Sequence, residues 1–403
     1  MKKEPLLFLC HRIPFPPNKG DKIRSFNMLK ALSQSFDIYL ACFVDDPFDW
    51  QYADKLDNYC QQKLLIKQNK TVSKIKGLQA FISGEAISVP YYYSRRMAKW
   101  TNDIISAHKI KQVFVYSSSM AQYVAGENYS ELNRIIDFVD VDSDKWNQYS
   151  EGKTGLARWV YKREWRKLQS LENKIAEEFQ HSLFVSPQEA NLFKQQVPES
   201  VSLKVSGMLN GVDTAFFDPQ NPDVQSAEEN IDVVFTGAMD YWANVDAVIW
   251  FSEKVWPLVK ASYPKASFFV VGGNPSSQIK ALDGQLGIKV TGRVQDVRPY
   301  IKSAKVVVAP LQIARGLQNK VLEAMSMAKP VVATSMAIEG IEARNEEIKI
   351  CDNAQDFSQQ VIDYLKHSTC ADNSRTWILD NLQWQSSLSR LPSLFKDDEL
   401  DVN

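Results

Sequence analysis

The sequence lacks a long apolar run, a net charge of either sign and any closely spaced pair of cysteines. Its 403 residues include 47 lysines and arginines against 48 aspartates and glutamates, so the formal net charge is −1. This balance gives no whole-chain field that would favour nucleic acid, and an anion site must come from a local cluster of cations. No apolar stretch approaches the roughly 20 residues that a membrane span needs.

Cysteine and histidine are also scarce. The five cysteines, at positions 10, 42, 60, 351 and 370, show no CxxC spacing. They predict buried thiols in a reducing cytoplasm rather than a disulfide framework or a zinc site. The N-terminal apolar run, residues 6–10, is shorter than the core of a secretion signal and is followed at once by Arg12 and prolines. We therefore expect a first buried strand and a cytoplasmic protein, with peripheral contact to the inner membrane face left open.

Two successive sets of short apolar runs alternate with helical patterns. The first set predicts strands at Pro5–Arg12, Asp37–Val44, Lys63–Lys67, Gln112–Ser118, Arg134–Val141 and His181–Ser186, and helices at Lys22–Gln34, Arg95–His108 and Leu156–Phe179. The second predicts strands at Ile231–Thr236, Ala266–Val271, Ile288–Thr291, Lys305–Pro310 and Pro330–Thr334, and helices at Asn244–Ser262 and Val321–Met327. Continuous apolar strands separated by helices predict parallel sheets covered on both faces, which is the doubly wound α/β architecture.

The repeated pattern predicts two Rossmann-like domains that face a central cleft. We place the first domain at residues 1–207 and the second at residues 208–375, and expect helices in residues 376–403 to cross back to the first domain. Ligands bind outside the carboxyl ends of the strands in such sheets. The loops that follow strands are therefore the segments to search for chemistry.

The strongest chemical signal lies in residues 315–334, which run from a strand end into a helix and on to the next strand. Gly316 permits a tight turn, and the amides after it would lie at a helix N-terminus, which favours anions. Lys320 adds a point charge for phosphate. Glu323 follows one turn into the helix, where its carboxylate could accept hydrogen bonds from ribose hydroxyls. The alternative is an ordinary strand–loop–helix with a solvated Glu323.

The sequence Leu322-Glu-Ala-Met325, followed by Pro330-Val-Val332, resembles the donor-site signature of the retaining GT-B glycosyltransferases of family 4. The resemblance implies two Rossmann-like domains and a ribose contact from Glu323. It further implies a donor-binding set made of Gly316, Leu317, Gln318, Asn319 and Leu322, with the amides of 317–319 on the diphosphate.

The same resemblance extends to other strand ends of the second domain, with two departures. Gly237 ends the first strand of that domain, and Arg293 and Val294 stand where the nucleobase usually packs, although a surface salt bridge for Arg293 is equally open. The family usually carries a glutamate at position 315 and a basic pair soon after the first strand. Here position 315 is Arg315 and the basic pair is absent. We expect Arg315 and Lys320 to supply the missing positive charge.

In the first domain, the loop after the first strand holds His11 and then Lys19, Gly20 and Arg24 around a helix start. By resemblance this is the glycine loop that approaches the donor phosphates and the acceptor. We predict that Lys19, Gly20 and Arg24 form this phosphate and acceptor loop. His11 ends a strand at the cleft. It is either a catalytic residue or a structural histidine whose hydrogen bonds are made within the fold.

Asp140-Val-Asp142 matches a DxD pattern, and alternating carboxylates on a strand would point to one side. A divalent metal site is one interpretation. We favour a strand end that faces the cleft, with Asp140 or Asp142 on the acceptor and no metal. The two-domain architecture binds its donor with protein cations and helix dipoles.

The predicted helix that begins at Leu156 is both basic and aromatic. It carries Arg158, Lys162, Arg163, Arg166 and Lys167 together with Trp159 and Trp165. Such a helix can rest on an anionic membrane, which would suit a lipid-linked acceptor, or it can be an ordinary solvated face.

Taken together, these motifs predict a retaining, metal-independent transferase without a cofactor. It would move a sugar from a UDP- or GDP-linked donor to a glycan or polyprenyl-linked acceptor in bacterial exopolysaccharide synthesis. The residues predicted to act in catalysis are Arg315, Lys320, Asp140, Asp142 and His11. Two alternatives stay open: a nucleotide-sugar 2-epimerase of the same fold, and a non-catalytic nucleotide-sugar-binding protein.

Overall fold

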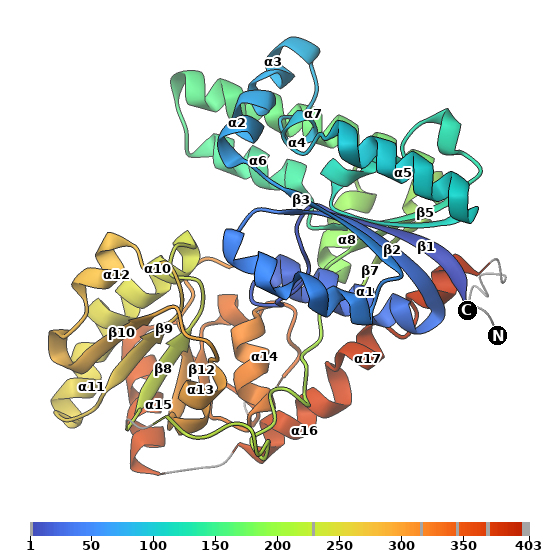
Figure 1. Ribbon diagram of the computed structural model, residues 1–403. Helices are drawn as coiled ribbons and strands as arrows, with labels where there is room; N and C mark the ends of the chain where they lie inside the picture. The colour runs from blue at the N-terminus through green and yellow to red at the C-terminus, as the bar shows by residue number, and fades with distance from the viewer. Residues whose placement is uncertain (1–2, 228–229, 315–316, 344–345, 368–370, 397–403) are drawn as a thin grey trace. The chain divides into compact units, whose positions relative to one another are not determined.

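The computed structural model of the chain describes residues 3–227, 230–314, 317–343, 346–367 and 371–396. The chain divides into two compact units. The first unit comprises Met1–Leu209 and Leu388–Asn403, and the second comprises Asn210–Ser387. Each contains one parallel sheet with helices packed against it, so the doubly wound α/β prediction is confirmed (Figure 1).

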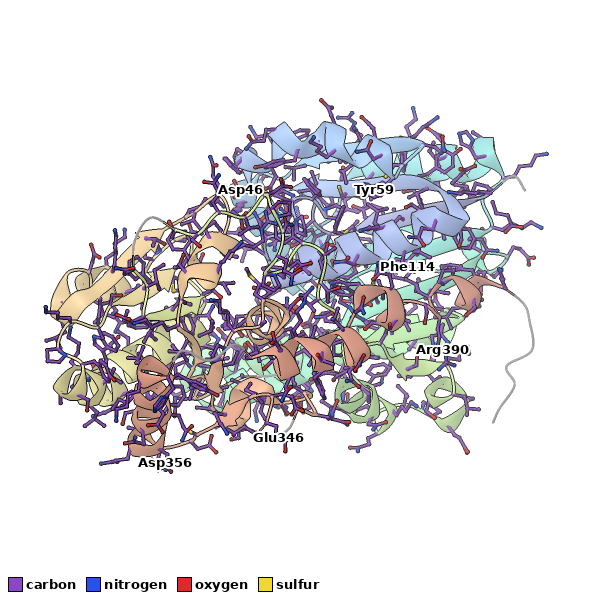
Figure 2. The ribbon with its side chains drawn as sticks, turned by 90° about the horizontal axis from the view of Figure 1, so that it is seen from below. Asp46, Tyr59, Phe114, Glu346, Asp356 and Arg390 are labelled. Carbon is purple, nitrogen blue, oxygen red and sulfur yellow. The ribbon has the colours of Figure 1, made fainter. Side chains whose placement is uncertain are left out.

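The sheet of the first unit has seven parallel strands in the order β3-β2-β1-β4-β5-β6-β7. Its central strands β1 and β4 are apolar over most of their length, as expected for strands that helices cover on both faces. The rings of Phe8 on β1 and Phe114 on β4 lie with their centroids 5.0 Å apart in this core. Phe114 is labelled in Figure 2. The strands are β1 (Glu4–Cys10), β2 (Phe36–Val44), β3 (Gln62–Lys67), β4 (Gln112–Tyr116), β5 (Asn133–Val139), β6 (His181–Phe184) and β7 (Val205–Gly207).

Three helices of the first unit, α2, α5 and α8, begin at a side-chain cap. Ser94 accepts a hydrogen bond from the Met97 amide at the start of α5, and Ser186 does the same for Glu189 at the start of α8. The helices are α1 (Gly20–Ser35), α2 (Lys70–Leu78), α3 (Ala80–Ser83), α4 (Ser88–Tyr91), α5 (Arg95–His108), α6 (Asp142–Glu151), α7 (Gly155–Glu178), α8 (Pro187–Lys194) and α9 (Glu199–Ser202). Shorter 3₁₀ segments are η1 (Pro47–Asn58), η2 (Ser118–Tyr123), η3 (Glu127–Tyr129) and η7 (Pro392–Phe395).

The sheet of the second unit has six parallel strands in the order β10-β9-β8-β11-β12-β13. The strands are β8 (Val233–Thr236), β9 (Phe268–Val271), β10 (Ile288–Gly292), β11 (Val306–Ala309), β12 (Val331–Ala333) and β13 (Lys349–Ile350). The helices are α10 (Trp242–Trp250), α11 (Trp256–Ser262), α12 (Ser277–Ala281), α13 (Arg298–Ser303), α14 (Asn319–Ser326), α15 (Ala354–Lys366), α16 (Asp372–Asn381) and α17 (Trp384–Ser387). Two 3₁₀ turns, η5 (Gln285–Gly287) and η6 (Ser335–Ile338), complete this unit.

The helix predicted over Asn244–Ser262 is a helical run with one wide turn. The segment η4 (Phe251–Val255) is a π turn between α10 and α11, in which the Trp256 amide donates to the Phe251 carbonyl. Pro257 follows directly and has no amide hydrogen, so the regular α-helical bonding pattern cannot continue through it.

The strand order reverses between β1 and β4 in the first unit and between β8 and β11 in the second. In open α/β sheets such a switch point leaves a crevice at the carboxyl ends of the two strands. We call these places the first-unit crevice and the second-unit crevice. The end of the chain differs from expectation, because α16 and α17 belong to the second unit and the crossing back begins only at Leu388, not at residue 376. No helix in the described part of the chain is long and apolar enough to span a membrane.

Candidate functional site

The second-unit crevice is built by the loop after β8 and by helix α14, which follows β11. Helix α14 begins at Asn319 with no side-chain cap on its first turn. Lys320 and Glu323 lie three residues apart on this helix and keep part of their side chains exposed. The helix N-terminus, a lysine and a carboxylate thus share one place in the fold, as the sequence predicted.

Lys320 is held by an uncharged partner. Its ammonium donates to Asn244 Oδ1 at 2.5 Å and lies 4.8 Å from the ring centroid of Phe235. Burial lowers the pKa of Lys320 to about 8, although Glu323 acts in the opposite direction. Among the residues that the structure describes, no carboxylate lies within salt-bridge distance of this ammonium. An anion that enters the crevice would therefore meet an uncompensated cation.

Glu323 carries the opposite shift for the same reason. Burial raises the pKa of Glu323 to about 7, against the opposing effect of Lys320. A carboxylate that is poorly hydrated and lacks a salt bridge in the described structure gains strongly from hydroxyl donors. The role of Glu323 as a hydroxyl acceptor stays a prediction.

Asn244 was missed by the sequence interpretation. Only 5% of it is exposed, and its Nδ2 donates to the Ala238 carbonyl at 2.9 Å while its Oδ1 accepts from Lys320. Asn244 thereby fixes Lys320 to the loop after β8. It lies 76 positions from Lys320, and no local sequence signal links the two.

Two glycines allow the loops at the ends of β8 and β9 to pass close together. A Cβ placed on Gly272 would meet the Gly237 carbonyl oxygen at 1.7 Å, and one on Gly237 would meet Asn244 Nδ2 at 2.7 Å. Both glycines have positive φ angles, 157° and 155° for Gly237 and Gly272. The predicted place of Gly237 at this crevice is what the structure shows, with a packing role toward Asn244.

The remaining residues predicted around α14 separate into backbone and core positions. Among the residues that the structure describes, the buried Asn319 side-chain oxygen has no hydrogen-bond partner. Gln318 is the N-cap, and its carbonyl accepts from the Val321 amide at 2.9 Å. Leu317 is 9% exposed, so any contact it makes to a ligand comes from its backbone. Leu322 is fully buried and its side chain belongs to the core, so any part it takes in the predicted donor-binding set also comes from its backbone. Arg315 and Gly316 lie outside the described residues.

Arg293 and Val294 follow β10, as predicted. Arg293 is exposed and its side chain lies 3.6–3.8 Å from where a Cβ on Gly273 would be, which places it beside the end of β9. Val294 is partly buried.

The first-unit crevice is lined by charges that neutralise one another. His11 Nε2 lies 3.5 Å from Asp21 Oδ2, and the His11 ring stacks on Tyr116 at the end of β4 with a centroid distance of 5.8 Å. Arg12 donates to the same Asp21 oxygen at 2.5 Å. Burial would raise the pKa of Asp21, but the His11 hydrogen bond and the Arg12 charge prevail and hold it well below its usual range. The sequence interpretation found His11 but missed Asp21 and Arg12.

Arg24 is not part of an accessible anion loop, and this prediction is wrong. Its side chain is fully buried and pairs with the fully buried Asp137 at 2.7 Å, while further bonds reach the carbonyls of Met208 and Phe184. The residue therefore joins α1 to the ends of β5 and β6. Gly20 is the exposed first residue of α1 and Lys19 is its partly buried N-cap, so these two remain at the surface of the loop.

The pair of aspartates at 140 and 142 does not lie on a strand. Strand β5 ends at Val139, and Asp142 is already the first residue of α6. The argument from strand alternation is therefore wrong. Lys145 instead donates to Asp140 at 2.5 Å and to Asp142 at 3.5 Å. Within the described ranges, no group of three or more histidine, cysteine or acidic side chains is arranged to hold a metal ion.

Residues 230–367 match the family model for glycosyl transferases group 1. A search of the curated proteins finds no match.

Solved structures match the whole chain. A structure of Anabaena HepE in complex with UDP and glucose covers 97% of this chain and 98% of its own, with a TM-score of 0.66 at 14% identity. Sucrose-phosphate synthase from Thermosynechococcus elongatus gives a TM-score of 0.68 at 14% identity, over 98% of both chains. WaaG, a glycosyltransferase involved in lipopolysaccharide biosynthesis, gives a TM-score of 0.63 at 14% identity, over 97% of this chain and all of its own. The family match covers about a third of the chain, within the second unit, and the structural matches show that the whole chain has the two-domain GT-B fold.

Proposed function

We propose that the second-unit crevice binds a nucleoside-diphosphate sugar, with the diphosphate at Lys320 and the first turn of α14. The observation that carries the proposal is the uncompensated ammonium of Lys320, held by a neutral amide at a helix N-terminus. A lysine whose charge is penalised by burial gains more from a bound anion than an exposed lysine does. The HepE structures that match this chain contain UDP and UDP-glucose, which makes a UDP-linked donor the first to test.

Glu323 would accept hydrogen bonds from the ribose hydroxyls one helical turn further along. Its position three residues after Lys320 sets the spacing between phosphate and ribose contacts. The buried amide oxygen of Asn319, which has no hydrogen-bond partner among the described residues, adds one further acceptor at the same helix start. These groups distinguish a nucleotide from a free diphosphate.

Transfer would rely on positioning and on stabilisation of the departing diphosphate, because the phosphate attached to the sugar gains negative charge as the sugar bond breaks. We propose retention at the anomeric carbon, independence of divalent cations and an acceptor that contacts the first-unit crevice through His11, with Asp21 orienting the ring. The resemblance of the donor motif supports retention, and a glycan or lipid-linked acceptor in bacterial polysaccharide synthesis fits the same resemblance. Asp140 and Asp142 remain candidates for acceptor contact through oxygens not bound to Lys145.

A thermal-shift and calorimetric screen with UDP, GDP and their glucose conjugates tests the donor site. Ligands of the folded state raise the melting temperature according to their concentration and Kd. We expect one diphosphate to bind in EDTA and Lys320→Met to abolish the shift. Lys254→Met, at an exposed lysine on η4 of the same unit, is the matched control and should bind like the parent.

Incubation of the bound nucleotide sugar without acceptor separates the alternatives. A transferase leaves the configuration of the sugar unchanged and releases nucleotide only slowly, by hydrolysis of the donor. Formation of the C2 epimer would establish the epimerase instead. Tight binding with no turnover against any glycan or lipid-linked acceptor would favour a nucleotide-sugar-binding protein. Absence of binding by every nucleotide would refute the proposed site.

A further inference from the structure

Seven large apolar side chains gather on the outside of the first unit. They lie on α2, on α3 and at the start of α7, and we call them the apolar patch: Val72, Ile75, Leu78, Phe81, Ile82, Leu156 and Trp159. Ile82 is 93% exposed and Leu156 is 77% exposed. Several large apolar side chains exposed on one face mark a place where another molecule binds.

Helix α2 shows that the patch is not a by-product of loose packing. The helix turns its small residues inward, since Ser73 and Gly77 are its buried positions, while Val72, Ile75 and Leu78 face outward. A Cβ on Gly77 would come within 3.1 Å of the Ile87 side chain, so the glycine permits this orientation. A helix that only covered a core would present its apolar stripe to that core.

Side-chain contacts join the two segments that form the patch, α2–α3 and the start of α7. Phe81 stacks on Trp159 with a centroid distance of 6.3 Å, and the Arg163 guanidinium lies 4.7 Å from the Phe81 ring centroid. Glu164, which is 1% exposed, accepts a hydrogen bond from the Ile87 amide at 2.6 Å. Figure 1 shows α2 and α3 beside the N-terminal half of α7. The patch is therefore one surface held by α7.

Basic side chains surround the patch, although the whole chain is close to neutral. Residues 69–84 contain no aspartate or glutamate, and residues 152–170 contain only the buried Glu164. The same two segments carry Lys70, Lys74, Lys76, Lys153, Arg158, Lys162, Arg163, Arg166 and Lys167. Apolar side chains ringed by cations match a bilayer surface that contains anionic lipid, where the rings and aliphatic groups enter the headgroup region.

We propose that the apolar patch and its basic rim dock the first unit on an anionic membrane surface. A second copy of the chain is a poor occupant, because two such surfaces face to face would bring like charges together. The proposal does not depend on nucleotide binding in the second unit. It extends the basic helix predicted from the sequence by a second insertion element, α2–α3, that sequence analysis did not find.

Co-sedimentation of the full chain with vesicles tests the proposal. With phosphatidylcholine vesicles containing 30% phosphatidylglycerol we expect binding in 0.1 M NaCl, weaker binding in 0.5 M NaCl and none to pure phosphatidylcholine. Ile82→Asp should lower the partition coefficient about tenfold or more, because it removes an inserted side chain and adds a repelled charge. Leu203→Asp is the matched control, since Leu203 in the same unit is 77% exposed but lies outside the patch.

Charge is tested separately by the double variant Lys74→Glu/Arg158→Glu, with Lys111→Glu as the control on an exposed lysine elsewhere. We expect the partition coefficient of the double variant to fall at least tenfold and the control to bind vesicles like the parent. A nitrobenzoxadiazole label on Ile82→Cys should shift its emission to the blue on vesicles, and the same label on Leu203→Cys should not.

Three outcomes would overturn the proposal. The first is that the parent does not bind anionic vesicles. The second is that Ile82→Asp and Leu203→Asp lose vesicle binding equally. The third is that the parent does not bind vesicles but forms a dimer in lipid-free sedimentation velocity, and that Ile82→Asp abolishes this dimer. Nucleotide binding by Ile82→Asp should equal that of the parent. The failure of docking and the failure of the proposed donor site can therefore be told apart.

Discussion

The two units place cations at the crevices of their sheets but compensate them in opposite ways. In the first unit three cations near the β1–β4 crevice each have a carboxylate partner, and in the second unit the amide of Asn244 holds Lys320. A compensated cation stabilises the fold, whereas an uncompensated one is left for an anionic ligand. The first-unit pairs are Arg12–Asp21, Lys22–Asp49 and Arg24–Asp137, with N–O distances of 2.5, 2.9 and 2.7 Å.

The largest effect should come from breaking a compensated pair. Arg24→Met leaves the carboxylate of Asp137 buried without its partner, and loss of one member of such a pair costs about 3–5 kcal/mol of stability. We expect a clear fall in the melting temperature of the first unit by calorimetry. Nucleotide binding by the second unit should be unchanged.

The control for this change lies on the same helix. Lys30→Met removes an exposed lysine of α1 and should leave the melting temperature close to that of the parent. If Arg24→Met melted like the parent but lost transfer activity, Arg24 would serve the ligand and not the fold. The contrast between the two crevices would then be wrong.

The uncompensated cation should give the reverse pattern. Lys320→Met should reduce the transfer rate on the order of 10²–10³, the range seen when one contact to developing charge is removed. Its stability should be equal to or above that of the parent, because burial already disfavours the Lys320 charge. Two measurements on Lys320→Met and on the parent check this: the turnover number with a UDP sugar, and the melting temperature without ligand. A large loss of stability would show that Lys320 is structural.

Glu323 should have a smaller effect that is confined to the nucleoside. Glu323→Gln keeps the shape and weakens each hydroxyl hydrogen bond, so about 1.5–3 kcal/mol of affinity for UDP should be lost. Affinity for inorganic pyrophosphate, which has no ribose, should not change. An equal loss of affinity for UDP and for pyrophosphate would place Glu323 near the phosphates instead.

The smallest effect concerns backbone strain beside the first-unit crevice. Val139 has a φ of 72°, a left-handed conformation that a β-branched residue adopts only at a cost. Its amide donates to Asp137 at 2.8 Å, which ties the strained residue to the Arg24–Asp137 pair. Val139→Gly should relieve about 1 kcal/mol of strain and raise the melting temperature slightly. A lower melting temperature would show that the valine side chain contributes more through packing than the strain costs.

Much of the architecture could be predicted from the sequence because strands covered on both faces are mostly apolar. The first five strands of the first unit were placed within two residues at both ends, and α5 was placed at its observed bounds. β7 was not predicted, because three residues ending in glycine give no periodic pattern. Asp140 and Asp142 were wrongly placed on a strand, since the apolar run continues through Val141 while the strand stops at Val139.

The donor motif could be found because its parts are adjacent in the sequence. The partners of its charges could not be found, because they are distant: Arg24 and Asp137 are 113 positions apart, and Lys320 and Asn244 are 76 apart. Arg24 and Lys320 look alike in the sequence, as basic residues near the start of a helix that follows a strand. Only the structure shows that one is compensated and the other is not.

The central claim is that Lys320 is a poorly compensated cation that a diphosphate binds. Its pKa of about 8 in the free protein should rise on binding, because an anion favours the charged form. Below that pKa the lysine is already protonated, and above it the proton must be taken up with the ligand. Affinity for UDP should therefore decline as the pH rises above 8. Calorimetric titration of UDP at pH 8, in buffers of different ionisation enthalpy, measures this uptake directly. We predict uptake of about half a proton by the parent and none by Lys320→Met. Equal uptake by both proteins, or none by the parent, would contradict the account.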